Sequence, residues 1–210
     1  MMSFAFHQFK KKLGYITVSS ARTMAFCGAV VTGGLMSSCY AVNTGTAMTT
    51  QSLGPWVTWT AAGQPGSDPY TRAHYAALGA LPLSSDTAQL YTAKTDNDGR
   101  RLHSSCDYAI EGRDVPSYWW SLSVFDDAGR LIANPADRYT FTSDTMGMRA
   151  DGSFVVSLSR DARPENWLPT GGAGRLAVTL QLIDLGVRAV ARDDDSVEKS
   201  LPIIRRISCK

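Results

Sequence analysis

Short stretches of alternating apolar and polar residues, separated by turns rich in aspartate and glycine, dominate the chain from residue 84 to residue 183. The clearest are 118–125 and 176–183, in which every second side chain is apolar and falls on one face. The other expected strands are 89–94, 106–110, 131–132, 139–142 and 154–158. About seven or eight short strands at this spacing predict a mainly β protein, an antiparallel β-sandwich of jelly-roll-like form.

One short helix is expected before these strands. Asp68 suits the N-cap, Pro69 suits the first helical turn, and Gly79 suits the position just past the end. Between them, the residues that recur at helical spacing and predict an apolar face are Tyr70, Ala73, Ala77 and Leu78. The sequence therefore predicts an amphipathic helix of about ten residues that packs on the β domain.

An apolar run over residues 24–42 contains no charged side chain. Its length is close to the roughly 20 residues that cross a bilayer. The basic residues that precede it are Lys10, Lys11, Lys12 and Arg22. They predict a cytoplasmic N-terminus and export of the rest of the chain. We expect an uncleaved signal anchor; a cleaved signal peptide, a lipoprotein signal ending at Cys39 and a buried soluble helix are the alternatives.

These patterns divide the chain into five expected parts. They are a basic cytoplasmic lead (1–22), a transmembrane signal anchor (23–42), a linker (43–53), the β domain (54–186) and a charged mobile tail (187–210). The partner that this division predicts is the membrane itself. The formal net charge of only +2 gives no reason to expect a nucleic-acid partner.

The four cysteines fall into two pairs. Cys27 and Cys39 lie inside the apolar run, where we expect no disulfide. Cys106 and Cys209 both belong to the exported part, so the compartment permits a bridge between them. Because nothing in their spacing demands one, we favour a buried Cys106 on a strand and a free Cys209 in the tail.

Few residues offer chemistry, and we expect neither a metal nor a cofactor. A zinc site would need both His74 and His103 with a carboxylate or Cys106. The turn 96–99 is rich in oxygen, as calcium loops are, but lacks their downstream glutamate. The chain has no nucleophile elbow, phosphate loop or dinucleotide fingerprint. Asp126 and Asp127 are available as a carboxylate pair, but a hairpin-turn role is favoured for them.

Two places are candidates for binding. Alternation puts Trp119 and Trp120 on opposite sheet faces, so an open face could stack a sugar or lipid headgroup on Trp119; we favour coverage by the N-terminal segment and helix. The second place is the stretch 166–172. Asn166 could line a pocket rim beside Arg138 and Arg163; we favour instead that Trp167 seals one end of the sandwich while Asn166 caps the turn.

An ordered set of motifs resembles a known family. The motifs are Trp120-Ser121-Leu122, Asp126, Gly129-Arg130-Leu131, Asn134, Arg138-Tyr139, Asp151-Gly152-Ser153 and Asn166-Trp167-Leu168-Pro169-Thr170. Across residues 54–185 they resemble the bacterial domain of unknown function 1214, DUF1214, in its short membrane-anchored subgroup. The resemblance implies a β-rich, jelly-roll-like fold and an envelope location: the bacterial inner membrane, crossed once, with the C-terminal domain in the periplasm. It implies no reaction.

Three functions remain open at this point. One is a purely structural accessory of a neighbouring membrane system, which the small residues Gly28, Gly33 and Gly34 of the apolar run suggest. The favoured one is a non-catalytic envelope protein that binds a protein partner or a small polar or amphipathic ligand, with Asn166, Trp167, Arg138, Asp107 and Trp119 as candidate binding residues. The alternative is a hydrolase-like enzyme whose pocket lies near Asn166, Arg138 and Asp107. The alternative requires an enclosed polar pocket that holds a buried carboxylate or histidine with a perturbed pKa.

Overall fold

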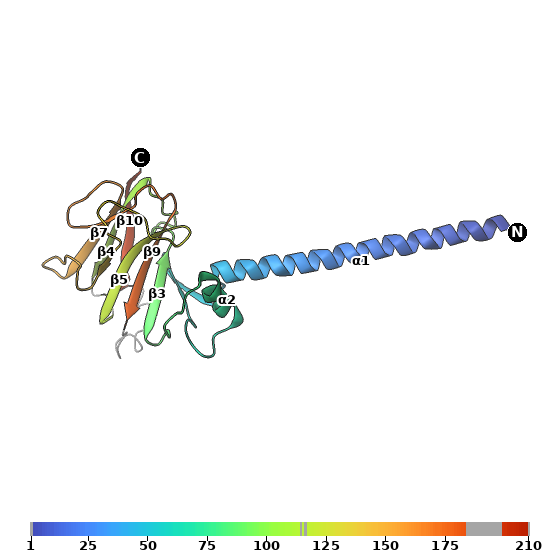
Figure 1. Cartoon of the computed structure of the whole chain (residues 1–210), viewed down its shortest axis with the longest axis horizontal. Coiled ribbons are helices and arrows are strands. Elements are labelled where there is room, and N and C mark those ends of the chain that lie inside the picture. Colours follow the sequence, from blue (N-terminus) through green and yellow to red (C-terminus); the bar gives the residue numbers. More distant parts are fainter. Residues whose placement is uncertain (1, 114, 116, 184–198, 210) are drawn as a thin grey trace. The chain divides into compact units, whose positions relative to one another are not determined.

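A computed structural model describes residues 2–113, 115, 117–183 and 199–209, with side chains from residue 20 onward (Figure 1). It forms two compact units that divide after Thr46. The first unit is the helix α1 (Met2–Thr44), in which Ser20–Thr44 is long and apolar enough to cross a membrane. The predicted lead and anchor are thus parts of one helix.

The second unit contains ten strands among its described residues, arranged in two sheets (Figure 1). The six-stranded sheet runs in the order β1 (Thr50–Leu53), β2 (Trp56–Trp59), β3 (Ala88–Ala93), β9 (Leu176–Ile183), β5 (Trp119–Asp126) and β6 (Thr140–Thr142). The four-stranded sheet runs in the order β10 (Ile203–Cys209), β4 (Cys106–Arg113), β7 (Ser153–Ser159) and β8 (Asn166–Pro169). Because β1 lies within 43–53, the predicted linker is shorter than expected.

Both sheets contribute to one core. In the larger sheet, Leu180 pairs with Tyr91 of β3 and Leu122 of β5, and all three side chains are buried. The smaller sheet contributes Ile110 of β4 and its neighbours on β7 and β10 in the same way. Trp120 also stacks on Phe154 across the gap, with ring centroids 5.0 Å apart. The predicted mainly β, sandwich-like fold is confirmed.

Helix α2 (Pro69–Leu78) has the expected boundaries but not the expected buried face. Asp68 accepts hydrogen bonds from the backbone N–H groups of Tyr70 and Thr71, and Gly79 adopts a left-handed φ of 64°. Burial raises the pKa of Asp68, but the hydrogen bond from the Thr71 hydroxyl and these backbone bonds outweigh it and hold the pKa below its ordinary value. The buried side chains are Thr71 and Tyr75. The predicted apolar face is wrong: Tyr70, Ala77 and Leu78 are exposed and Ala73 is only partly buried.

The face that α2 does present to the sheet is set by an aromatic contact. His74 stacks on Trp59 of β2, with ring centroids 4.2 Å apart, and Tyr75 meets the same indole edge-on. These residues share one side of the helix with Thr71. Leu78 follows Tyr75 by three residues and His74 by four, so it lies on this same side, but at the end of the helix it is 63% exposed.

Residues 166–169, which we expected to close one end of the sandwich through Trp167, form strand β8. It pairs parallel with β7, from Val156 opposite Asn166 to Ser159 opposite Pro169, so the sheets are not purely antiparallel. Leu168 is fully buried, whereas Trp167 is only partly buried. The prediction that Trp167 seals the core is wrong, because strand alternation turns Leu168 inward instead.

The C-terminal segment also differs from the prediction. Residues 203–209 form β10, which pairs antiparallel with β4, and Ile204 is fully buried in the core. The prediction of a mobile tail is therefore wrong for this part. The charged residues 193–195 lie outside the described residues.

Candidate functional site

Asn166 binds the protein's own backbone. Its Oδ1 accepts from the N–H of Gly147 at 2.8 Å, and its Nδ2 donates to the carbonyls of Gly147 and Val155 at 2.9 and 3.0 Å. The residue is buried, and these three bonds occupy its amide group. Asn166 thus holds the loop before β7 against β8 and does not line a pocket rim.

Trp167 and Arg138 do lie side by side. The indole N–H of Trp167 donates to the Ser159 carbonyl at 3.1 Å. The Arg138 guanidinium is 3.5 Å from the Trp167 carbonyl and 5.7 Å from the centre of the Phe141 ring. Arg138 is exposed and Trp167 is partly buried, and the polar groups of both side chains face the protein's own backbone.

The remaining two predicted residues lie elsewhere. Asp107, on β4, pairs with Arg163 at 2.6 Å on the outer face of the smaller sheet. Trp119 is on the outer face of the larger sheet, where its indole N–H donates to Asp144 at 3.2 Å. Helix α2 contacts β2, which is separated from β5 by β3 and β9, so the helix does not cover Trp119 as expected. The five candidates do not form one site, and none of them lines the cavity described below.

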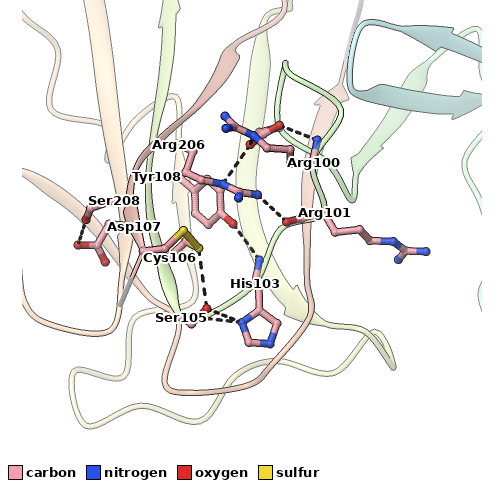
Figure 2. The surroundings of a disulfide bond; sticks show 11 residues. Arg100, Arg101, His103, Ser105, Cys106, Asp107, Tyr108, Arg206 and Ser208 are labelled. Carbon is pink, nitrogen blue, oxygen red and sulfur yellow. Dashed lines mark hydrogen bonds and ion pairs between the residues drawn. A yellow bond between two sulfur atoms is a disulfide. The ribbon is translucent and has the colours of Figure 1, made fainter.

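Cys106 and Cys209 form a disulfide, which corrects the expectation of free thiols (Figure 2). They stand opposite each other in the pairing of β4 with β10. Beside them, the His103 ring accepts from the Ser105 N–H at 3.1 Å, and the His103 N–H donates to the Tyr108 hydroxyl at 3.0 Å (Figure 2). His103 therefore belongs to the turn before β4, and the described residues contain no cluster suited to a metal ion.

The oxygen-rich turn at 96–99 also holds β10. The Asp96 carboxylate, only 1% exposed, accepts from the backbone N–H and the Nε of Arg100 at 2.8 and 3.1 Å and pairs with Nε of Arg206 at 3.2 Å. Asn97 exchanges two hydrogen bonds with the backbone of Ile204, at 2.7 and 3.0 Å. Farther along, the Trp56 indole donates to the Pro202 carbonyl at 2.7 Å. The turn's oxygens are thus engaged by arginines and by the chain itself.

A cavity of about 190 Å³ lies on the outer face of the larger sheet, and we take it as the candidate site. Helix α2 and the loop 80–83 form one side of it, and β2, β3 and β9 form the other. Its lining includes the side chains of Trp59, Tyr75, Leu81, Leu83, Leu90 and Gln181.

The cavity is mainly apolar, with a few neutral polar groups. Gln181 and Ser85 supply amide and hydroxyl groups, and Ser85 Oγ accepts from Gln64 at 2.7 Å. Burial raises the pKa of the Tyr75 hydroxyl, so that this group is neutral at physiological pH. None of the described lining residues is a carboxylate or a histidine. This lining suits binding of an apolar or amphipathic molecule better than proton transfer.

Sequence reasoning missed this site. Its signal was the loop Ala80-Leu81-Pro82-Leu83, which is apolar but fits neither helical nor strand periodicity. An apolar loop that follows a helix stop at Gly79 and contains a proline has no secondary structure that would bury it.

Comparisons with known proteins support the fold and leave the chemistry open. Residues 87–184 match the model of the protein family of unknown function DUF1214, which confirms the predicted resemblance over that range. A solved structure from Vibrio parahaemolyticus, VPA0106, is similar with a TM-score of 0.53 at 19% identity. The match covers 68% of this chain but only 36% of that one, so this chain spans about a third of that protein.

A second solved structure, of an uncharacterised protein from Burkholderia cenocepacia, has a TM-score of 0.37 at 16% identity, with 59% of this chain and 29% of that chain covered. No curated protein matches this chain. The similarity to VPA0106 extends to the fold alone.

Proposed function

We propose, from the premise that this chain belongs to the DUF1214 family, that it is a membrane-anchored, non-catalytic binding protein of the bacterial envelope. Helix α1 anchors it in the inner membrane, as in the short subgroup of the family. The β domain lies in the periplasm. There the cavity beneath α2 binds a small apolar or amphipathic molecule.

The location is supported by two independent observations. Ser20–Thr44 has the length and composition of a membrane span, and basic residues precede its apolar part, which favours a cytoplasmic N-terminus. The disulfide between Cys106 and Cys209 is typical of oxidising compartments such as the periplasm and rare in the cytosol.

The binding role rests on a single observation, the apolar cavity with its few convergent polar groups. A small apolar pocket of this kind is the usual form of a ligand site. The carboxylates that the hydrolase hypothesis would need are engaged in ion pairs: Asp107 with Arg163, Asp126 with Arg130 and Asp127 with Arg175. The non-catalytic role therefore accounts for more of what is observed than catalysis does.

Native mass spectrometry of the full chain, extracted from native membranes in mild detergent, tests the binding role. We expect an additional mass on the wild type that is lost in Gln181→Trp, because the indole fills the cavity. Thr179→Trp is the matched control: it changes the same face of the same strand two residues away, outside the cavity lining. An extra mass that survives in Gln181→Trp, or none in the wild type, would contradict the proposal.

A fusion of alkaline phosphatase to the C-terminus tests the location. The enzyme is active only where its own disulfides form, so we expect activity in intact cells. A fusion of a cytoplasmic reporter at the same position should be inactive. The reverse pattern would place the β domain in the cytoplasm and overturn the proposed topology.

A further inference from the structure

Three exposed leucines line the cavity, and a fourth, Leu78, shortly precedes the lining loop 80–83 in the chain. Leu81 is 98% exposed, Leu83 54% and Leu90 41%, and all three line the cavity. Leu78, at the end of α2, is 63% exposed. We call these four residues the apolar rim. Scattered exposed leucines are ordinary, but a group around a cavity marks an interaction surface.

The loop that carries the rim is held firmly against the domain. A Cβ at Gly63 would lie 2.4 Å from the carbonyl oxygen of Leu83, so the two backbones pack with no side chain between them. After the loop, the N–H of Ser85 donates to the carbonyl of Ala62 at 2.9 Å. Leu81 and Leu83 are therefore exposed on a loop whose backbone packs on the domain, so their exposure is built into the fold.

The chain joins the β domain next to this cavity. Thr50 of β1 pairs with Trp59 of β2, which lines the cavity, and the Thr60 N–H donates to the Thr49 carbonyl at 3.1 Å. Only residues 45–49 separate α1 from β1. Since an extended residue spans at most about 3.6 Å, the tether reaches about 18 Å.

We propose that the apolar rim docks on the surface of the lipid bilayer that α1 crosses. This inference rests on the proposed function, because it requires α1 to lie in the membrane. The short tether keeps the cavity wall near the bilayer, and leucine side chains partition into the boundary between headgroups and acyl chains. The cavity mouth then opens toward lipid, so an amphipathic ligand can reach it from the membrane.

Fluorescence in reconstituted vesicles tests the docking. The full chain, with Cys27 and Cys39 changed to serine, is placed in vesicles of phosphatidylethanolamine and phosphatidylglycerol. An environment-sensitive dye is attached at Ala80→Cys, beside the rim leucines, which stay intact. We expect a blue shift of its emission, and loss of that emission when the lipids carry a quencher on the acyl chain near the headgroup.

Two variants control this measurement. The dye at Ala128→Cys, in the exposed turn after β5, should show neither effect. In the Ala80→Cys chain, changing Leu78, Leu81 and Leu83 to asparagine should abolish both the shift and the quenching. A dye at residue 80 that behaves like the dye at 128 would overturn the proposal. A blue shift without lipid quenching would overturn it too, since a protein or a second copy would then cover the rim.

The two proposals fail in different ways. If alkaline carbonate washes the chain off the vesicles, the membrane anchor and the proposed function fail together. A chain that resists the wash but shows no quenching at residue 80 refutes the docking alone. The native mass measurement is made in detergent and does not depend on docking.

Discussion

In strand β10 and in the loop 80–83 (the rim loop), burial is the opposite of what the composition of each segment suggests. The C-terminal segment is rich in charge, yet Ile204 is fully buried and the strand is attached to distant parts of the chain. The loop 80–83 is apolar, yet Leu81 is almost completely exposed. The difference shows that burial follows from the partners that a segment meets, and only secondarily from its own hydrophobicity.

The partners of β10 are spread along the chain. Trp56 binds Pro202, the turn at 96–99 binds Ile204 and Arg206, and the disulfide fixes Cys209. Each is separated from β10 by about a hundred residues or more in the sequence. The attachments described above for the rim loop, at Ala62 and Gly63, lie about twenty residues away in the sequence. We therefore expect mutations at the attachments of β10 to affect stability most and mutations of the rim to affect it least.

Removing the disulfide should have the largest effect. In Cys209→Ser, the loss of a link between residues 103 apart should lower the free energy of unfolding by about 4 kcal/mol. Urea unfolding of the full chain in mild detergent, followed by tryptophan fluorescence, measures it. Wild type treated with reductant should match the variant, and Cys27→Ser with Cys39→Ser should not change stability. A reduced wild type as stable as the oxidised one would contradict the role of the disulfide.

The next largest effect is expected at Asp96. In Asp96→Ala, the loss of a buried carboxylate leaves Arg206 and two backbone N–H groups without their partner, and we expect a loss of about 3 kcal/mol. The same urea titration measures this loss. The disulfide should also be reduced more easily in this variant, because β10 is held less firmly.

Asp126 provides a matched control, because its turn repeats the bonds of Asp96. Its carboxylate accepts from the N–H of Ala128 and from both the N–H and Nε of Arg130, but it contacts no part of β10. It is 16% exposed, against 1% for Asp96. Asp126→Ala should therefore lower the free energy of unfolding at pH 7 by less than Asp96→Ala does. Equal losses would contradict a special role for the turn at 96–99.

The sign of the pH dependence at Asp126 follows from its pKa. The backbone N–H of Arg130, with the other bonds of the turn, holds that pKa below the ordinary value of 3.8. A lowered pKa in the folded state stabilises the fold above the ordinary pKa and loses that effect as the pH falls through the lowered value. The difference in free energy of unfolding between wild type and Asp126→Ala should thus vanish at acidic pH.

Local signals in the sequence predicted part of this fold with good accuracy. Strict alternation placed β9 at 176–183, and the caps Asp68 and Gly79 placed α2 at its observed limits. These signals work because capping and alternation depend on residues close in the sequence. β10 was missed because its pairing and its attachments lie far away in the chain, where local pattern carries no information.

The candidate site was less predictable for the same reason. Asn166 and Trp167 were singled out correctly as structurally constrained, but which of their groups face the chain depends on β7 and on the loop at Gly147. The cavity arises where α2 packs on β2 through His74 and Trp59. The helix was predicted by its caps, but the face that it buries was decided by this tertiary contact.

A glycine pair tests how the rim loop is held. Gly63 and Gly79 share a φ of +64°, but a Cβ at Gly63 would collide with the Leu83 backbone, while nothing lies within 4 Å at Gly79. Gly63→Ala should lower the free energy of unfolding by about 2 kcal/mol. Gly79→Ala should lower it by about 1 kcal/mol, from the backbone conformation alone. The difference, measured by urea unfolding, reports the close packing of the loop. Equal costs would mean that the loop yields freely.

The smallest effect on stability is expected at the rim itself. Leu81→Asn alters a side chain that is 98% exposed, so the free energy of unfolding in detergent should change by less than about 0.5 kcal/mol. Ile204→Ala, in contrast, removes a fully buried side chain of β10 and should cost about 3 kcal/mol. If Leu81→Asn destabilised the domain as Ile204→Ala does, Leu81 would be part of the fold. The unchanged stability expected here would show that this leucine acts at the surface, in the cavity lining or against lipid, and not in the core.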